Sequence, residues 1–573
     1  MPAIVAWACA PNAGPSAEPA APASPPFSTV PVPEPVTAPA PSQSALAVAA
    51  PRSLEFDVGP LREPNWREQT STPRVRVKTP RVPLKKRWSA RIGKTTFRST
   101  MALVGDAIVI GSHGASLQGK NEKSDGVYVL DGKTGKKRLQ IATPGTGDLD
   151  VGGIAVEGDV VYFTTDNSQI VAAALGTGKV VWKAAARGKV RPAPALGDLN
   201  GDGHVDLVAG DEEGVLRALD GKSGQSLWLV ATGVNEYSAR GFIGAAAIAD
   251  LDGDQRDDVI AGARDGILAA YRGRDGSVIW QVPGDSGIHA SPSVADFDQD
   301  GRPEVLSAWS YGQIAIVDGR SGAKRWQARM EQDDGGIEGL FGSPIPLPGA
   351  PGVLVAPTAW WGGDDGVIGV AVEQRAWKGF EGRVSATPVV GDIDGDGSKE
   401  AIIGTEKGKL IALSADGERA ELATLGGPIE APALLADADG DGRWELFVAS
   451  NDGLLTCFET AAATLPDVSR FRGSKPHNRG DLGPIRLGWR AREAASGAPP
   501  SVAGPPSVRV DYLRCCTALT EAAARAPAPQ DAALLNAAGQ CNTLAARAAP
   551  RDRALSAIKT ALDGKATLPE QCR

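Results

Sequence analysis

The chain has 573 residues, more than one hydrophobic core usually holds, so we expect several domains or one large domain built from repeats. Its net charge of −8 offers no basic surface for nucleic acid, and no apolar run reaches the roughly 18 residues of a membrane-spanning helix. Glycine is frequent, with 70 residues, and tryptophan, with 13, is the commonest aromatic residue. Many turns with a recurrent tryptophan indicate a repeated all-β unit.

The first 52 residues differ in composition from the rest. A short apolar stretch at residues 4–10 precedes a Pro/Ala-rich run that cannot pack a core and is expected to form a disordered, extended linker. Cys9, at the head of this run, resembles the lipid-carrying cysteine of bacterial lipoproteins, although Ala6-Trp7-Ala8 departs from the usual leucine-containing box. We therefore expect residues 1–52 to serve export and tethering, with lipidation of Cys9; a cytoplasmic tail is the alternative.

The other end of the chain, residues 508–573, follows a linker at 491–507 and is rich in Ala and Leu with proline breaks. It predicts three short helices at about 510–526, 531–547 and 551–563. Four of the six cysteines lie here: Cys515, Cys516, Cys541 and Cys572. Clustered cysteines in an even number indicate disulfides and an oxidising compartment. A bond between the adjacent pair would be strained, so we expect each of those two to reach Cys541 or Cys572, in an order left open.

Five acidic segments share one pattern, and they begin at Asp198, Asp250, Asp296, Asp392 and Asp437. Their starts are 52, 46, 96 and 45 residues apart, and the 96 corresponds to two periods with one unit that lacks the acidic loop, near residue 343. Two further units precede the first loop, at about 102–139 and 154–182. The chain is therefore expected to contain eight repeats.

Each unit has the same internal order of elements. A small residue and a proline, such as Ala193-Pro194, open a first strand, and the acidic loop follows. A β-rich run such as 258–262, a glycine turn, a third strand such as 267–271 and an Asp-headed hairpin lead to a fourth strand. This strand ends in tryptophan at Trp182, Trp228, Trp280, Trp326 and Trp377. Four strands in about 45 residues are typical of a propeller blade, and we expect the tryptophans to pack between blades.

Over residues 85–480 these units resemble the quinoprotein-type (PQQ-like) and integrin-type (FG-GAP or VCBS) propeller repeats. Residues 471–480 resemble the ring-closing end of quinoprotein-type propellers, in which a segment before the first blade pairs with the last blade. Residues 65–88 are the candidate partner. The expected fold is all-β: an eight-bladed propeller at residues 53–490 with a small helical module behind it.

The acidic loops predict calcium sites. Oxygen side chains at positions one, three, five and nine, with a glycine that lets the backbone reverse, form a cage that suits the six to eight oxygen ligands of Ca²⁺. The predicted ligands are Asp198, Asn200, Asp202, Asp206, Asp250, Asp252, Asp254, Asp258, Asp296, Asp298, Asp300, Glu304, Asp392, Asp394, Asp396, Glu400, Asp437, Asp439, Asp441 and Glu445.

Without a cation the carboxylates of each loop would repel one another, which argues against five merely solvated turns. Five Ca²⁺ would shift the net charge from −8 to +2. The second loop departs from the pattern, with Gln255 in place of glycine and an extra Asp257. We expect the metals to be structural, with the affinities of about 10⁻⁴–10⁻³ M that are typical of extracellular calcium modules.

The loops on the opposite face are the expected ligand surface, because the acidic loops and the hairpins between strands three and four share the first face. Aromatic and charged residues gather in these loops and suit a sugar or a peptide. The candidates are Glu236, Tyr237, Arg240, His289, Trp309, Tyr311, Trp360 and Trp361.

These features predict an extracytoplasmic, secreted or surface-tethered monomer that binds a glycan or protein and needs no organic cofactor. A polysaccharide lyase or a quinoprotein dehydrogenase is the enzymatic alternative. The chain has only four histidines, and the neighbouring cysteines, which in quinoprotein dehydrogenases lie inside the propeller, here lie outside it. A third alternative is an assembly scaffold, similar to the outer-membrane assembly lipoproteins with their eight-bladed propellers.

Overall fold

The chain divides into two compact units, Met1–Arg52 and Ser53–Arg573, and the description below concerns the second. The computed structural model describes residues 75–77, 84–117, 122–234, 239–298, 300–330, 339–349, 352–358, 366–371, 375–379, 382–463, 468–473, 477–482, 506–547 and 549–572, with the backbone only for 375 and 506–512. The predictions for Cys9, Glu236, Tyr237, Trp360 and Trp361 lie outside the described residues.

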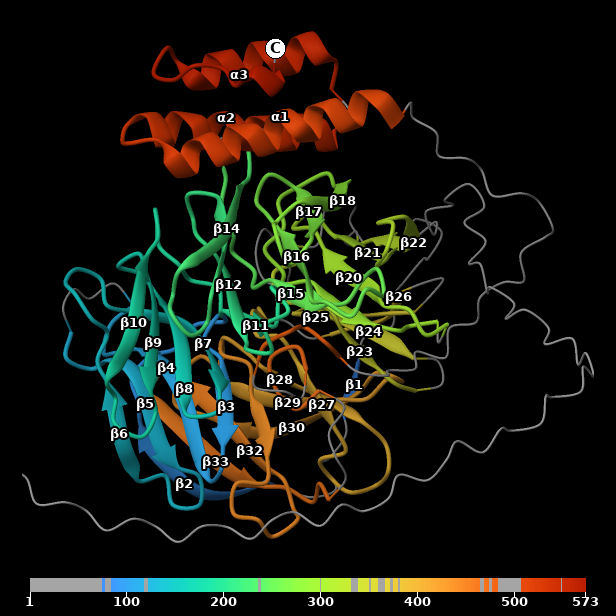
Figure 1. Cartoon of the computed structure of the whole chain (residues 1–573). Coiled ribbons are helices and arrows are strands. Elements are labelled where there is room, and N and C mark those ends of the chain that lie inside the picture. The colour runs from blue at the N-terminus through green and yellow to red at the C-terminus, as the bar shows by residue number, and fades with distance from the viewer. Residues whose placement is uncertain are drawn as a thin grey trace, which may run out of the picture. The chain divides into compact units, whose positions relative to one another are not determined.

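Eight sheets, here called blades A to H, follow one another along the chain (Figure 1). Blade A contains β3 (Met101–Val104), β4 (Ala107–His113), β5 (Asp125–Asp131) and β6 (Lys137–Ile141), and blade B contains β7 (Val151–Glu157), β8 (Val160–Thr165), β9 (Gln169–Ala174) and β10 (Val180–Ala185). Blade C contains β11 (Ala195–Gly197), β12 (Asp206–Gly210), β13 (Val215–Leu219) and β14 (Ser226–Ala231). Blade D contains β15 (Ala247–Ala249), β16 (Asp258–Gly262), β17 (Ile267–Tyr271) and β18 (Val278–Pro283).

The remaining blades complete the ring. Blade E contains β19 (Ser293–Ala295), β20 (Glu304–Ala308), β21 (Gln313–Asp318) and β22 (Lys324–Arg329), and blade F contains β23 (Ile345–Leu347), β24 (Val353–Pro357), β25 (Val367–Val370) and β26 (Arg375–Lys378). Blade G contains β27 (Val389–Gly391), β28 (Glu400–Gly404), β29 (Lys409–Leu413) and β30 (Glu418–Thr424), and blade H contains β31 (Leu434–Ala436), β32 (Glu445–Ser450) and β33 (Leu454–Glu459). The predicted eight-bladed propeller is confirmed.

Ring closure joins the two ends of the propeller sequence. Strand β2 (Lys85–Arg91) precedes blade A but pairs antiparallel with β33, and so becomes the fourth strand of blade H. A further short strand, β1 (Arg76–Val77), lies parallel to β30 at the edge of blade G. Both pairings cover sheet edges that would otherwise be open to other chains. The predicted N-terminal partner of the last blade is therefore confirmed for its final residues.

The recurrent tryptophans pack between blades, as their spacing predicts. Trp182 donates its indole N–H to the carbonyl of Gly221 at 2.8 Å, and Trp280 donates to Gly319 at 2.6 Å. In each case the acceptor lies in the hairpin between strands three and four of the next blade. Trp88 of β2 makes the same contact with Gly132 of blade A at 3.0 Å, so ring closure uses the same interaction. The buried rings exclude water from the seams, and the N–H groups are satisfied.

A segment described at residues 468–473 and 477–482 contacts the first strands of five blades. Leu196 of blade C, Ile248 of blade D and Leu435 of blade H donate backbone hydrogen bonds to it, as do Val294 and Val390. Because first strands of so many blades can be reached only from the middle of the ring, this segment lies across the central channel. There it buries Arg472, whose guanidinium donates to the carbonyls of Ala246 and Pro292. The described residues of this segment thus stabilise the centre of the ring.

The C-terminal module contains α1 (Pro506–Arg525), α2 (Gln530–Ala546), α3 (Arg551–Leu562) and a short 3-10 helix, η2 (Glu570–Cys572), and the three predicted helices are confirmed. Disulfides join Cys515 to Cys572 and Cys516 to Cys541, so the adjacent cysteines are bonded to separate partners, as expected. Helix α2 packs on blade C through β14 (Figure 1). No described helix is long and apolar enough to cross a membrane.

Candidate metal loops and ligand cavity

The acidic loops all join the first and second strands of their blades. In loops two to five, three carboxylates each bring an oxygen within 4.8 Å of the others, an arrangement that could hold a metal ion. The first loop carries the amide of Asn200 between Asp198 and Asp202 in the same positions. Hard cations such as Ca²⁺ accept carboxylate and amide oxygens of this kind. Four of the five predicted loops are therefore acidic clusters suited to a metal, and the first is their amide-containing counterpart.

Backbone N–H groups orient the carboxylates of these loops. In loop four Asp392 accepts hydrogen bonds from the backbones of Asp396 and Gly397, both at 3.0 Å. Asp394 accepts from the Asp396 N–H at 3.2 Å, and Glu400 accepts from the Ile393 N–H at 3.1 Å. These hydrogen bonds hold the loop in a tight turn, and a turn held in this way lowers the ordering cost of binding a cation.

The carboxylate at position nine is the most buried one in loops one, two, three and five, whereas in loop four Asp392, at 7% exposed, is more buried than Glu400. Burial, together with the neighbouring carboxylates, raises the pKa of Glu304 and of Glu400 to about 8. The pKa of Asp258 is raised to about 7 and that of Asp206 to about 6, in both cases mainly by burial. Groups that are this costly to ionise without a counter-charge favour a bound cation.

Loop five differs from loop four in one respect. Arg87 of β2 donates to Asp439 at 2.6 Å and to Glu445 at 2.8 Å, and the two carboxylates are only 6% and 3% exposed. The positive charge of the Arg87 guanidinium therefore takes the place that a bound cation would have in the other loops. In loop two Arg272 similarly pairs with Asp252 at 2.7 Å.

The departures in loop two have structural explanations. Gln255 adopts a positive φ of 65°, so the backbone reverses there as it does at the glycines of the other loops. Asp250 still accepts the Gln255 N–H at 2.9 Å. The extra Asp257 points away from the cluster and forms a two-pronged ion pair with Arg479 of the segment in the central channel. It therefore helps to fasten that segment to blade D.

A cavity of about 710 Å³ lies on the other face, between blades D and E and helix α2. His289 and Tyr311, two of the predicted ligand residues, line it together with Arg264, Phe341 and Arg547. His289 accepts or donates a hydrogen bond of 2.8 Å with the Ser310 hydroxyl. Burial, followed by the charges of Arg264 and Arg98, lowers the pKa of His289 to about 4, so the ring is neutral near pH 7.

Two other predicted ligand residues lie elsewhere. Arg240 pairs with Glu213 at 2.6 Å and lines a separate cavity of about 210 Å³ next to α2. Trp309 is completely buried and donates its indole N–H to the Gly266 carbonyl at 3.0 Å. Its ring also packs against Gly284, so no face of it is open to a ligand. Trp309 therefore acts as a core residue in this structure, contrary to the expected ligand contact.

The contribution of α2 to the cavity was not predicted. Gln540, Thr543, Leu544 and Arg547 form one of its walls. Nothing in their spacing indicates a ligand site, because they lie more than two hundred residues from the blades they face. The predicted helices could have suggested that the C-terminal module covers one face of the propeller, but the sequence did not specify which face.

The comparisons with known proteins agree with this fold. The family profile described as outer membrane protein assembly factor BamB matches residues 123–336, and no curated protein matches the sequence. Among solved structures, a europium-containing methanol dehydrogenase has a TM-score of 0.50 at 14% identity, covering 67% of this chain and 96% of that chain.

BamB from Moraxella catarrhalis has a TM-score of 0.47 at 18% identity, covering 66% of this chain and 99% of that chain. The quinohemoprotein alcohol dehydrogenase ADHIIG from Pseudomonas putida HK5 has a TM-score of 0.46 at 13% identity, covering 78% and 83%. At such identities a structural likeness concerns the fold alone. The family profile, the repeats and the eight blades together identify the chain as one built around an eight-bladed PQQ-like β-propeller.

Proposed function

We propose that this protein is an extracytoplasmic, calcium-stabilised β-propeller that binds a protein segment in the cavity between blades D and E and helix α2. The observation that carries the proposal is the cavity of about 710 Å³, walled partly by the disulfide-bonded helical module. Cavities of this volume lie within the usual range of ligand sites.

The lining favours a ligand that has apolar and acidic groups. Leu340, Phe341 and Leu544 supply apolar walls, and Arg264 and Arg547 supply two guanidinium groups. Two carboxylates also line the cavity, but Asp285 is paired with Arg329 and Asp265 accepts a hydrogen bond from Thr543. Guanidinium groups bind carboxylates by paired hydrogen bonds. An extended peptide with apolar and acidic side chains meets both requirements. A protein partner is also supported over a glycan by the matching profile, whose description is that of an assembly factor.

The compartment follows from the disulfides and the loops. Two disulfides are stable in an oxidising environment, and calcium loops of this type are saturated where calcium is abundant. We propose five Ca²⁺ in loops one to five, with loop five the weakest because Arg87 already pairs with its carboxylates. Secretion, or tethering through a lipid on Cys9, would place the protein outside the cytoplasm.

The ligand site can be tested with fluorescent peptides of mixed apolar and acidic sequence, and with a panel of neutral oligosaccharides as a second arm. We expect peptide binding that Tyr311→Ala and Arg547→Ala weaken at least tenfold with an unchanged melting temperature. Lys222→Ala, an exposed change on the acidic-loop face, is the matched control. Binding of oligosaccharides but not peptides, or equal binding by all variants, would contradict the proposal.

A further inference from the structure

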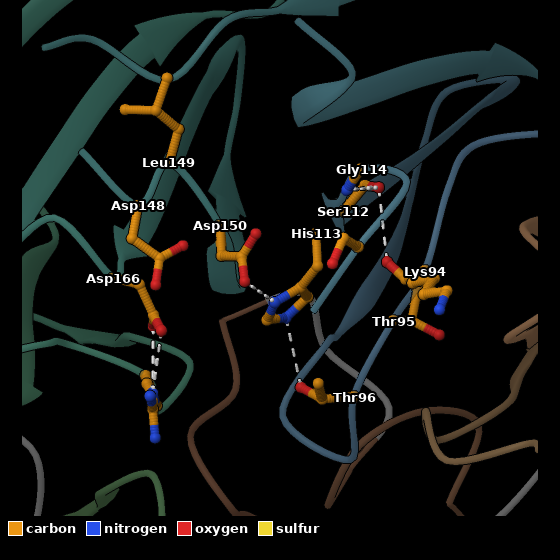
Figure 2. A network of polar contacts seen from close by, with 12 residues as sticks. Lys94, Thr95, Thr96, Ser112, His113, Gly114, Asp148, Leu149, Asp150 and Asp166 are labelled. Atoms are coloured by element: carbon orange, nitrogen blue, oxygen red, sulfur yellow. Dashed lines mark hydrogen bonds and ion pairs between the residues drawn. The ribbon is translucent and has the colours of Figure 1, made fainter. Parts of the chain in front are cut away.

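A second group of carboxylates lies on the face opposite the acidic loops, at the seam between blades A and B. Asp148 and Asp150 belong to the crossing that precedes β7, and Asp166 follows β8. One oxygen from each lies within 4.8 Å of the others. His113, the last residue of β4, faces them from blade A and places its Nδ1 2.8 Å from Asp150 Oδ2 (Figure 2).

Two of these carboxylates have oxygens that no described group satisfies. The Asp150 side chain is 1% exposed, and its Oδ1 is buried without a hydrogen-bond partner. Asp148 Oδ1 is likewise buried and unpartnered. Burying a carboxylate oxygen without a hydrogen-bond donor or a cation costs free energy, so two neighbouring oxygens of this kind point to a bound cation. Figure 2 shows Asp150 between His113 and the other two carboxylates.

Two positively charged side chains, Lys189 and Arg191, already form ion pairs with other oxygens of this cluster. Lys189 contacts Asp148 Oδ2 at 2.7 Å and Asp166 Oδ2 at 2.8 Å. Arg191 contacts Asp166 at 3.1 Å but shares its charge with Glu212, at 2.7 Å. Neither reaches Asp150 among the described contacts. Asp150 therefore has no lysine or arginine partner among the described contacts, and Asp148 Oδ1 has no described hydrogen-bond donor.

The seam between blades A and B differs from the tryptophan-containing seams in its side chains, and both blades lack an acidic loop. Blades A and B have two-residue turns where blades C, D, E, G and H have acidic loops. At other seams a tryptophan of the fourth strand packs on a hairpin glycine of the next blade. Between blades A and B the corresponding residues are Leu139 and Gly178, and a Cβ atom added to Gly178 would lie 3.5 Å from the Leu139 side chain. The Thr100 hydroxyl, which donates to the Ile154 carbonyl at 2.6 Å, already links the two blades, and a cation would add a link on the face opposite the acidic loops.

We propose that Asp148, Asp150 and Asp166 bind one Ca²⁺ at the seam between blades A and B, on the face opposite the acidic loops. The three carboxylates supply hard oxygen ligands, of the kind that Ca²⁺ accepts in variable geometry. His113 holds Asp150 in place from blade A, so it is a positioning residue. This site is separate from the acidic loops and needs none of them.

The test counts calcium in the whole protein by mass spectrometry after dialysis against a defined calcium buffer. We expect Asp150→Asn, which keeps the shape of the side chain, to remove about one equivalent of Ca²⁺ relative to the wild type. Asp394→Asn in loop four, the matched control, should remove about one other equivalent, and the double variant about two. An Asp150→Asn protein with the full wild-type content overturns the proposal. A full content in Asp394→Asn would instead count against calcium in the loops.

A second measurement does not depend on how the variants fold. Crystals of the wild-type protein with Tb³⁺, which replaces Ca²⁺, should show an anomalous peak beside Asp148 and Asp150. Density without such a peak, while the loops carry theirs, overturns the proposal.

Lys189→Met, which removes the neighbouring ammonium group, should tighten binding of Ca²⁺ at this site several-fold. Binding of Ca²⁺ at this site in Lys189→Met but not in the wild type would show that the cluster serves as a partner for Lys189, and would overturn the proposal.

Discussion

The indole Nε1 of Trp280 lies 2.6 Å from the carbonyl oxygen of Gly319, across the seam between blades D and E. The same ring rests on Gly322, whose φ of 70° and lack of a side chain let the hairpin approach. One residue thus supplies an interblade hydrogen bond and fills the space above a turn. The contact recurs at several seams, so its strength contributes to the stability of the ring as a whole.

Replacing Trp280 with alanine should lower the free energy of unfolding by about 3–5 kcal/mol, because a large buried ring is lost and a cavity remains. Trp280→Phe keeps most of the apolar contact and loses the N–H donor, so a smaller loss of about 1–3 kcal/mol is expected. Urea denaturation followed by circular dichroism measures both. Equal losses in the two variants would show that the hydrogen bond, and not the packing, dominates.

Loop five should respond to calcium differently from loop four. Arg87→Met removes the guanidinium that pairs with Asp439 and Glu445. In calcium-free buffer this variant should melt at a lower temperature than the wild type, since two buried carboxylates lose their partner. Saturating calcium should restore most of that loss. Lys86→Met, an exposed change on the same strand, is the control and should melt like the wild type in both buffers.

His289 should make the protein sensitive to acid. Its pKa is lowered to about 4 in the folded protein, against about 6.5 in an unfolded chain. As the pH falls from 6.5 towards 4, the unfolded chain takes up a proton that the folded protein does not, so stability falls by at most about 1.4 kcal/mol per pH unit. His289→Gln should flatten this dependence in denaturation curves between pH 4 and 7. His204→Gln, on an exposed loop residue, should leave it unchanged.

The helical module should depend on Thr543 for its attachment to the propeller. The Thr543 hydroxyl donates to Asp265 Oδ2 at 2.8 Å, and Asp265 is only 2% exposed. Thr543→Val leaves this buried carboxylate without that donor, at a cost of about 1.5–3 kcal/mol. Hydrogen exchange of α2 should therefore become faster. Thr560→Val removes a hydroxyl whose described hydrogen bond is to the Ser556 carbonyl of its own helix, and it should not change the exchange.

The sequence determined the features that repeat over a short distance. The acidic loops, the glycine turns and the tryptophan of the fourth strand lie within one period of about 45 residues, so spacing alone predicts four strands per blade and eight blades. Each loop also folds through contacts between near neighbours, as between Asp392 and Gly397. The possible disulfide pairings were also reduced by a local argument, because a bond between the adjacent Cys515 and Cys516 would be strained. Local order was therefore readable from the chain.

The tertiary structure decided what depends on residues far apart. Arg87 reaches Glu445 across 358 positions, Asn542 donates to the Ala231 carbonyl across 311, and no periodic pattern encodes either contact. Trp309 was expected in a ligand surface because it lies outside the repeating tryptophan position, but the neighbouring blade buries it. A blade's sequence specifies its own strands, whereas the faces it covers are fixed only when the ring closes and the helical module packs onto it.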